Sequence, residues 1–165
     1  MSSTEVPIRD ATTVLLLRRT SAGASVLMGM RGAQAVFMPS KYVFPGGAVD
    51  AADATAPLAK PLGQIHAARL RAEPRPGTNP DPHAIAAAAL RELAEETGQL
   101  IGVKDAQASA WPGYAEAGLG ADASSLIYIF RAITPPGRPR RFDAHFFAAD
   151  AVSLTSDPDD FSRAC

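Results

Sequence analysis

Apolar and polar residues follow one another in short blocks along the first part of the chain, and these blocks predict strands. Residues 12–19 are β-branched and leucine-rich, residues 25–31 form a second such run, and the turn-forming segment 20–24 separates them. Two such runs joined by a short turn are typical of a β-hairpin. Val14 to Leu17 is apolar without alternation, which predicts a strand covered on both faces.

Strand-like runs recur later in the chain, at residues 41–44, 100–103, 126–134 and 144–149. The last two flank a basic, proline-rich loop, so we expect them to pair antiparallel. A short helix is expected within residues 62–73, whereas residues 107–124 are rich in Ala and Gly and carry no assignable pattern. We find no internal repeat and expect residues 1–165 to form a single domain.

The strongest helix signal begins at Asp81. Asp81 is followed by Pro82, which predicts an N-cap and a proline at the first helical position. An alanine-rich run then continues to about Thr97, and Gly98 is the expected C-terminal stop. The sequence therefore predicts one long helix over residues 82–97.

Three carboxylates share one face of this helix, because Glu92, Glu95 and Glu96 have the spacing i, i+3 and i+4. Like charges at this spacing repel one another, and a cation between them removes that cost. An all-oxygen ligand set suits Mg²⁺ or Mn²⁺ rather than zinc. The small residues Ala88 and Ala89 should leave room for a ligand to approach. The alternative interpretation is a solvated acidic face near a helix end.

Composition limits the classes of function. The chain has 165 residues, 47% of them hydrophobic, and a formal net charge of -1. The near-neutral charge argues against binding to nucleic acid or to an anionic membrane. The single cysteine is Cys165, residues 1–10 do not resemble a secretory signal, and no apolar run is long enough to span a bilayer. We therefore expect a cytoplasmic location.

Phe44-Pro45-Gly46-Gly47, followed later by Arg91-Glu92-Leu93-Ala94-Glu95-Glu96-Thr97-Gly98, resembles the signature of the Nudix hydrolases. That signature reads G-x5-E-x7-R-E-U-x-E-E-x-G-U, where U is a bulky apolar residue. Gly47 matches its first glycine, and the helical half matches at every fixed position up to Gly98. Residues 54–90 number 37 where the usual signature has seven, so the chain carries an insert at about 54–81. Asp53 stands where the family usually has Glu, and Gln99 stands at the final apolar position.

The resemblance implies an α/β fold, a Nudix-type α/β/α sandwich on a mixed sheet. It also implies a metal-dependent pyrophosphohydrolase, or diphosphatase, that acts on a small-molecule nucleoside diphosphate linked to another moiety, with water as the nucleophile. Mg²⁺ or Mn²⁺ would be held by Glu92, Glu95 and Glu96, with the Gly47 carbonyl completing the ligand set. One of these glutamates, or a carboxylate on a later loop, would take the proton from the attacking water, and Arg91 would orient a glutamate.

The long insert and the segments 134–136 and 141–147 are similar to the subgroup that cleaves coenzyme A or its acyl esters. Candidate substrate-binding residues are Arg31, Phe37, Arg141 and Asp143, which stand at expected strand ends or loops. For each of them, ordinary solvation or core packing is the alternative interpretation.

Alternative functions stay open at this point. The chain resembles either an enzyme of this kind, with ADP-ribose or NADH as alternative substrates, or a Nudix-like binding or regulatory module without turnover. The intact glutamate trio favours the enzyme, and removal of an RNA cap is less favoured. The closing strand and helix that the family has after residues 144–149 are not recognised here. We therefore expect a truncated chain, and a homodimer if this form is the native one.

Overall fold

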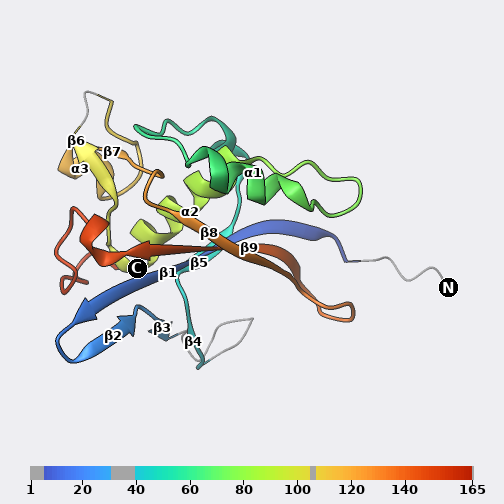
Figure 1. Cartoon of the computed structure of the whole chain (residues 1–165), viewed down its shortest axis with the longest axis horizontal. Coiled ribbons are helices and arrows are strands. Elements are labelled where there is room, and N and C mark those ends of the chain that lie inside the picture. The colour runs from blue at the N-terminus through green and yellow to red at the C-terminus, as the bar shows by residue number, and fades with distance from the viewer. Residues whose placement is uncertain (1–5, 31–39, 105–106, 165) are drawn as a thin grey trace.

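The computed structural model describes residues 6–30, 40–104 and 107–164. Its centre is a five-stranded sheet of β1 (Ile8–Thr20), β2 (Gly23–Val26), β5 (Gly46–Ala48), β8 (Ile127–Ile133) and β9 (Arg141–Asp150). β9 pairs with one edge of β1, β2 and β5 share the other edge, and β8 adds to the far side of β9 (Figure 1). β1 and β9 run parallel and all other pairs in this sheet are antiparallel, so the sheet is mixed, as predicted.

The predicted hairpin is confirmed in its first part. β1 and β2 pair antiparallel with Thr20 opposite Gly23, and Gly23 has a φ of 121°, which favours glycine at this turn. The second strand of the hairpin is shorter than predicted and ends at Val26. The chain then forms β3 (Gly29–Met30), which pairs with β4 (Tyr42–Val43) in a separate two-stranded sheet.

The region without an assignable pattern holds short elements. α3 (Tyr114–Ala117) and β7 (Leu119–Ala121) lie there, and β7 pairs antiparallel with β6 (Gly102–Lys104). Two single 3₁₀ turns, η1 (Ala51–Thr55) and η2 (Ala151–Ser153), follow β5 and β9. η1 carries the buried Asp53.

The predicted long helix is confirmed as α2 (Pro82–Thr97). The Asp81 carboxylate accepts a hydrogen bond from the N–H of His83 at 2.9 Å, which caps the start of the helix. Gly98 has a φ of 71° and donates its N–H to the carbonyl of Ala94 at 2.8 Å, which ends the helix. Within the described residues, no helix combines the length and the apolar character needed to cross a membrane.

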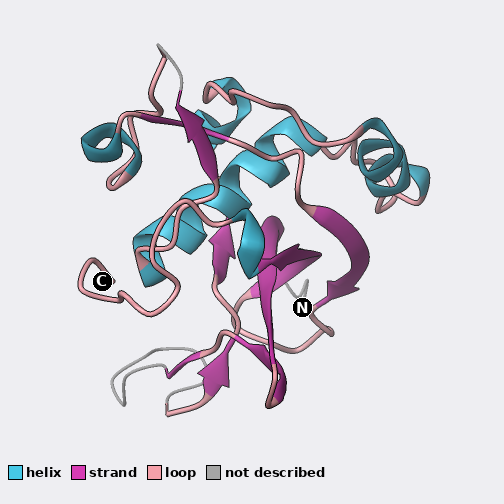
Figure 2. Cartoon of the chain, turned by 60° about the vertical axis from the view of Figure 1, so that its left-hand side comes forward, coloured by secondary structure: helices cyan, strands magenta, loops and turns pink. Residues whose placement is uncertain are grey.

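The helices α1 (Gln64–Ala72) and α2 cover one face of the sheet (Figure 2). α2 contacts β1 and β5, and α1 contacts both β8 and α2. All residues from Ala84 to Leu90 are buried, so the expectation of open space beside Ala88 and Ala89 was wrong. The reason is that η1 packs against α2, and so does α1 of the insert.

The second face of the sheet is less well covered. Val14 is 0% exposed, whereas its neighbour Leu15 is only half-buried, so the prediction that both faces of β1 are covered holds for one face only. Phe130 stacks on Phe146 with a ring-centroid distance of 4.4 Å, yet Phe130 remains 47% exposed. The physical reason is that α1 and α2 both lie on the opposite face.

Candidate active site

Arg91 lies at the centre of the site, where α2 meets β5 and η1. Its Nε and Nη2 atoms donate hydrogen bonds to the two carboxylate oxygens of Asp53, each at 2.9 Å. Its Nη1 donates to Glu92 at 2.8 Å and to Glu95 at 3.2 Å. Nη2 also donates to the carbonyl of Ala48 at 3.2 Å. A single guanidinium therefore fixes two of the helix carboxylates relative to the strand and the 3₁₀ turn.

Asp53 is the buried partner of Arg91. It is 1% exposed, and its Oδ2 also accepts a hydrogen bond from the N–H of Asp50 at 2.8 Å. The hydrogen bond with Asp53 is the main cause that raises the pKa of Arg91, and burial acts in the opposite direction. Asp53 thus makes this contact in spite of the 37-residue separation at 54–90.

The backbone of β5 contacts the carboxylates of α2. The N–H of Gly46 donates to Glu96 Oε2 at 3.0 Å. A Cβ added to Gly47 would lie 2.4 Å from the Glu92 carboxylate, closer than any real contact of that kind. Only glycine at position 47 therefore leaves space for Glu92 in this place.

The cluster gathers several carboxylates. Arg91 forms ion pairs with Asp50, Asp53, Glu92 and Glu95, and Glu96 accepts a hydrogen bond from the N–H of Gly46 on the adjoining strand. Burial is the main cause that raises the pKa of Glu92; Glu96 and Glu95 add to it, and Arg91 opposes it. Burial, with a smaller contribution from Glu96 and Glu95, thus makes the charged form of Glu92 costly, and a divalent cation bound here would relieve that cost.

These residues fit a divalent cation. The donors are carboxylate oxygens, the ligand type that Mg²⁺ and Mn²⁺ prefer, and the Glu92 carboxylate lies against the backbone at Gly47. The arrangement can therefore bind a hard cation and, through it, the oxygens of a diphosphate.

A second group of possible ligands lies on the α2 face of β1 and β9. One ligand atom each of Asp10, Asp143 and His145 lies within 4.8 Å of the others. Arg75 Nε lies 3.2 Å from Asp143 Oδ2, Arg75 Nη2 lies 3.5 Å from Asp10, and Arg131 Nε forms an ion pair with Asp143 Oδ1 at 3.1 Å. Two guanidiniums already balance the two carboxylates. By distance this group could hold a metal, but its charge does not call for one.

His145 belongs to this second group and is 0% exposed. Burial lowers its pKa, while the nearby Asp143 acts in the opposite direction. Neither ring nitrogen of His145 forms a hydrogen bond with any described residue. Burial thus favours the neutral imidazole, and Asp143 Oδ1, 3.9 Å from His145 Nε2, acts against it.

The residues predicted to bind substrate do not join the carboxylate cluster around Arg91 in the described part of the structure. Arg141 is buried and donates from Nε to the carbonyl of Thr134 at 3.1 Å, and Asp143 is 2% exposed. The structure therefore places both inside the start of β9, whereas it gathers the glutamates, Arg91 and Gly47 into one site. Arg31 and Phe37 lie outside the described residues. The substrate-binding role of all four stays a prediction.

Two residues near these clusters were missed from the sequence. Asp50 lies 3.7 Å from both Arg91 and Arg9, and its position between Gly47 and Asp53 in the same segment is a signal that could have found it. Arg75 gave no such signal, because its partner Asp143 is 68 positions away.

Several solved structures resemble this chain, and one of them has a TM-score above 0.5. A Nudix hydrolase from Alicyclobacillus acidocaldarius is similar in structure, with a TM-score of 0.65 and 28% identity over 88% of this chain and 70% of that one. The M. smegmatis Nudix hydrolase RenU has a TM-score of 0.40 and 18% identity over 92% of this chain and 67% of that one. A C. elegans Ap4A hydrolase complex has a TM-score of 0.43 and 15% identity over 95% and 74%. No protein-family model and no curated protein sequence matches the chain.

The family assignment rests on the first of these structures, because the other two TM-scores are below 0.5. That structure shares the mixed α/β fold, and the signature residues of this chain converge on one carboxylate cluster at the start of η1 and the end of α2. The assignment expected from the signature is thereby confirmed. The signature and the shared fold therefore support the assignment of the chain to the Nudix hydrolases, as a Nudix-type pyrophosphohydrolase.

Proposed function

We propose that the chain hydrolyses the diphosphate linkage of coenzyme A or of an acyl-coenzyme A, with Mg²⁺ or Mn²⁺ bound at the glutamates. The family assignment supports diphosphate cleavage. The choice of coenzyme A rests on the long insert and on the segments 134–136 and 141–147, which are similar to the subgroup with that activity.

The metal ligands in this proposal are the carboxylates of Glu92, Glu95 and Glu96 together with the carbonyl of Gly47. A bound divalent cation neutralises charge on the phosphate oxygens and lowers the pKa of water. The supporting observation is the close approach of the Glu92 carboxylate to the backbone at Gly47, where a Cβ would lie 2.4 Å from it.

Glu95 is our candidate for the residue that takes the proton from the attacking water. Its side chain is 38% exposed, compared with 16% for Glu92, so solvent reaches it more easily. Arg91 Nη1 holds it at 3.2 Å. The oxygen of water then bonds to one phosphorus, the bridging P–O bond breaks, and the products are two phosphate monoesters.

Arg91 acts in this scheme as a positioning residue. It holds Glu92 and Glu95 at the same time and is itself held by Asp53, so the two carboxylates keep a fixed separation before substrate binds. This fixed arrangement is the single observation that carries the proposal, because preorganised charge is what stabilises a phosphoryl-transfer transition state.

The test is a panel of coenzyme A, an acyl-coenzyme A, ADP-ribose, NADH and diadenosine polyphosphates, assayed with Mg²⁺ and then with Mn²⁺. We expect turnover of coenzyme A or its acyl ester, and a loss of at least ~10²-fold in Glu95→Gln and Glu96→Gln. Glu73→Gln is the matched control, because Glu73 is an exposed glutamate of the insert.

Preferred turnover of ADP-ribose or NADH would overturn the choice of coenzyme A but keep the chemistry. An absence of turnover across the panel, in protein whose circular dichroism shows it to be folded, would overturn the proposed activity and favour a binding module. Equal activity of the wild type and of Glu95→Gln would remove Glu95 from the mechanism.

A further inference from the structure

An arginine-lined cavity lies at the start of the two parallel strands, outside the carboxylate cluster. Its volume is about 380 Å³, and it is bounded by residues 6–9 of the β1 side and residues 139–142 of the β9 side. The charged lining residues are Arg9, Arg140 and Arg141, and Val6, Pro139 and Phe142 contribute apolar surface. None of the described residues that line it is acidic.

The three guanidiniums differ in how they are held. Arg141 is buried and anchored to the carbonyl of Thr134, whereas Arg140 is exposed and has no ion pair with any described residue. The Arg9 side chain is 61% exposed, and its ion pair with Asp50 is long, at 3.7 Å. Two of the three cations are thus available to a ligand. Planar guanidiniums suit the geometry of a phosphate, and the apolar wall suits the group that carries it.

The alternative interpretation is a chance meeting of solvated arginine side chains. Two features argue against it. The cations come from two segments that are adjacent only because β1 and β9 pair, with Ile8 opposite Arg141 and Arg9 opposite Phe142. They also surround a hollow rather than a flat surface, so an anion there would contact several of them at once.

The cavity is linked to the carboxylate cluster through Asp50. One oxygen of Asp50 lies 3.7 Å from Arg9 and the other lies 3.7 Å from Arg91. Along β1, Arg9 is three residues before Thr12, which pairs with Gly47; at a rise of ~3.3 Å per residue this is about 10 Å. Because the guanidiniums of Arg9 and Arg91 both lie 3.7 Å from the Asp50 carboxylate, one nucleotide-sized substrate can span the cavity and the cluster.

We propose that this cavity binds a second anionic group of the substrate, a phosphate monoester carried on the nucleoside part in addition to the diphosphate that is cleaved. The proposal rests on the proposed function and narrows its substrate class. Arg9 and Arg140 then act as specificity residues, and the diphosphate lies at the glutamates while the monoester lies between the two strand starts.

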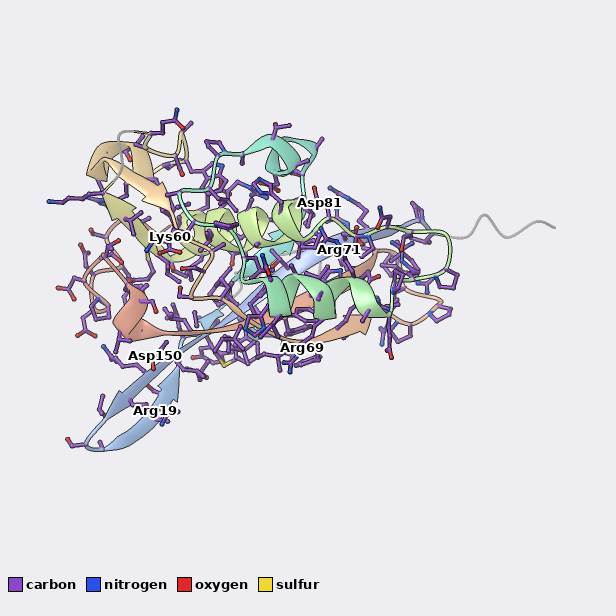
Figure 3. The ribbon with its side chains drawn as sticks, turned by 45° about the horizontal axis from the view of Figure 1, so that its top comes forward. Arg19, Lys60, Arg69, Arg71, Asp81 and Asp150 are labelled. Carbon is purple, nitrogen blue, oxygen red and sulfur yellow. The ribbon has the colours of Figure 1, made fainter. Side chains whose placement is uncertain are left out.

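The test compares coenzyme A with 3′-dephospho-coenzyme A, which differ only in that phosphate monoester. We expect the wild type to prefer coenzyme A, and Arg9→Gln and Arg140→Gln each to lower kcat/KM for coenzyme A by about tenfold through KM. Turnover of the dephospho form should stay unchanged. Arg19→Gln is the matched control: Arg19 is an exposed arginine at the other end of β1, on the hairpin with β2 (Figure 3).

Equal losses on both substrates, or no preference in the wild type, would overturn the proposal while leaving the hydrolase activity in place. If neither substrate is cleaved, the proposed function fails, and calorimetric binding of adenosine 3′,5′-bisphosphate and of AMP decides the inference separately. Tighter binding of the bisphosphate that is lost in Arg9→Gln and Arg140→Gln, but kept in Arg19→Gln, supports the cavity. Equal binding of the two nucleotides overturns it.

Discussion

Asp53→Asn is the change that most directly tests how the site is held together. Asp53 is 1% exposed and makes two hydrogen bonds of 2.9 Å with the guanidinium of Arg91, whose side chain is 10% exposed. An asparagine side chain has the same size but only one acceptor oxygen. Its amide N–H₂ would face a guanidinium N–H, so one charged hydrogen bond is lost and a donor faces a donor.

The magnitude follows from burial. Breaking one side of a buried ion pair costs about 3–5 kcal/mol, and we expect the lower end because Arg91 keeps Glu92 and Glu95 as partners. A cost of about 3 kcal/mol in a domain of this size corresponds to a fall in Tm of roughly 6–12 °C. Turnover should fall too, since the loosened guanidinium no longer fixes the two glutamates.

The assay is urea unfolding followed by the fluorescence of the single Trp111, together with thermal circular dichroism. Asp159→Asn is the matched control, because Asp159 pairs with Arg18 at 2.7 Å while 72% exposed, and such surface pairs contribute about 0.2–1 kcal/mol. A loss for Asp53→Asn no larger than that of the control would refute the idea that Asp53 and Arg91 organise the site.

Asp53→Glu restores the residue that the family usually has at this position, and it tests how closely the Asp53 side chain fits beside Arg91. The extra methylene must fit where Asp53 is 1% exposed and where its carboxylate already accepts a hydrogen bond from the N–H of Asp50. We therefore expect a loss of roughly 1–3 kcal/mol from overpacking. A gain in stability would show that the site has room for the longer glutamate side chain, and would contradict the expected overpacking.

Three further predictions concern neighbouring contacts. Gly47→Ala should displace the carboxylate of Glu92 and lower turnover by ~10²-fold with metal present, whereas Gly63→Ala, with its nearest contact at 3.7 Å, should leave turnover unchanged. The pKa of Glu92 is raised in the folded protein, so its contribution to the free energy of unfolding is present below its ordinary pKa of 4.5 and is lost as pH rises through the folded pKa. Adding Mg²⁺ at pH 7 should restore the lost stability. A urea midpoint that does not change with pH in the absence of metal would contradict this prediction. Asp143→Asn should lower the free energy of unfolding by about 3–5 kcal/mol and make the loop around Arg75 sensitive to limited proteolysis. Unchanged protection of that loop would contradict the idea that the Arg75–Asp143 ion pair holds it.

The elements with local signals could be predicted from the sequence. Asp81 and Pro82 define the start of α2 and Gly98 defines its end, because capping depends only on residues within the same turn. The glutamate spacing is similarly local, so the common face of Glu92 and Glu95 follows from helix geometry alone. In these cases one helical turn contains all the information needed.

The contacts that depend on tertiary packing could not be predicted in the same way. Arg75 meets Asp143 across 68 positions, and no local pattern around either residue indicates the other. The space expected beside Ala88 is filled for the same reason, since the packing of η1 and α1 on α2 is not encoded in α2 itself. The short elements α3 and β7 have too few residues to show a period.

The insert does not disturb the signature, because its two ends are fastened to each other. Asp53 precedes it and is bonded to Arg91, and His83, just after it, has its Nε2 atom 2.8 Å from the carbonyl of Ala56. Lengthening a loop whose ends are already held together costs little free energy. Asp53 and Arg91 therefore form a bidentate contact although they are 38 positions apart, as they could if the spacing were short. Within the insert, Arg75 forms an ion pair with Asp143 of β9. Substitutions near Arg75 should therefore alter how α1 covers the sheet and leave the glutamates in place.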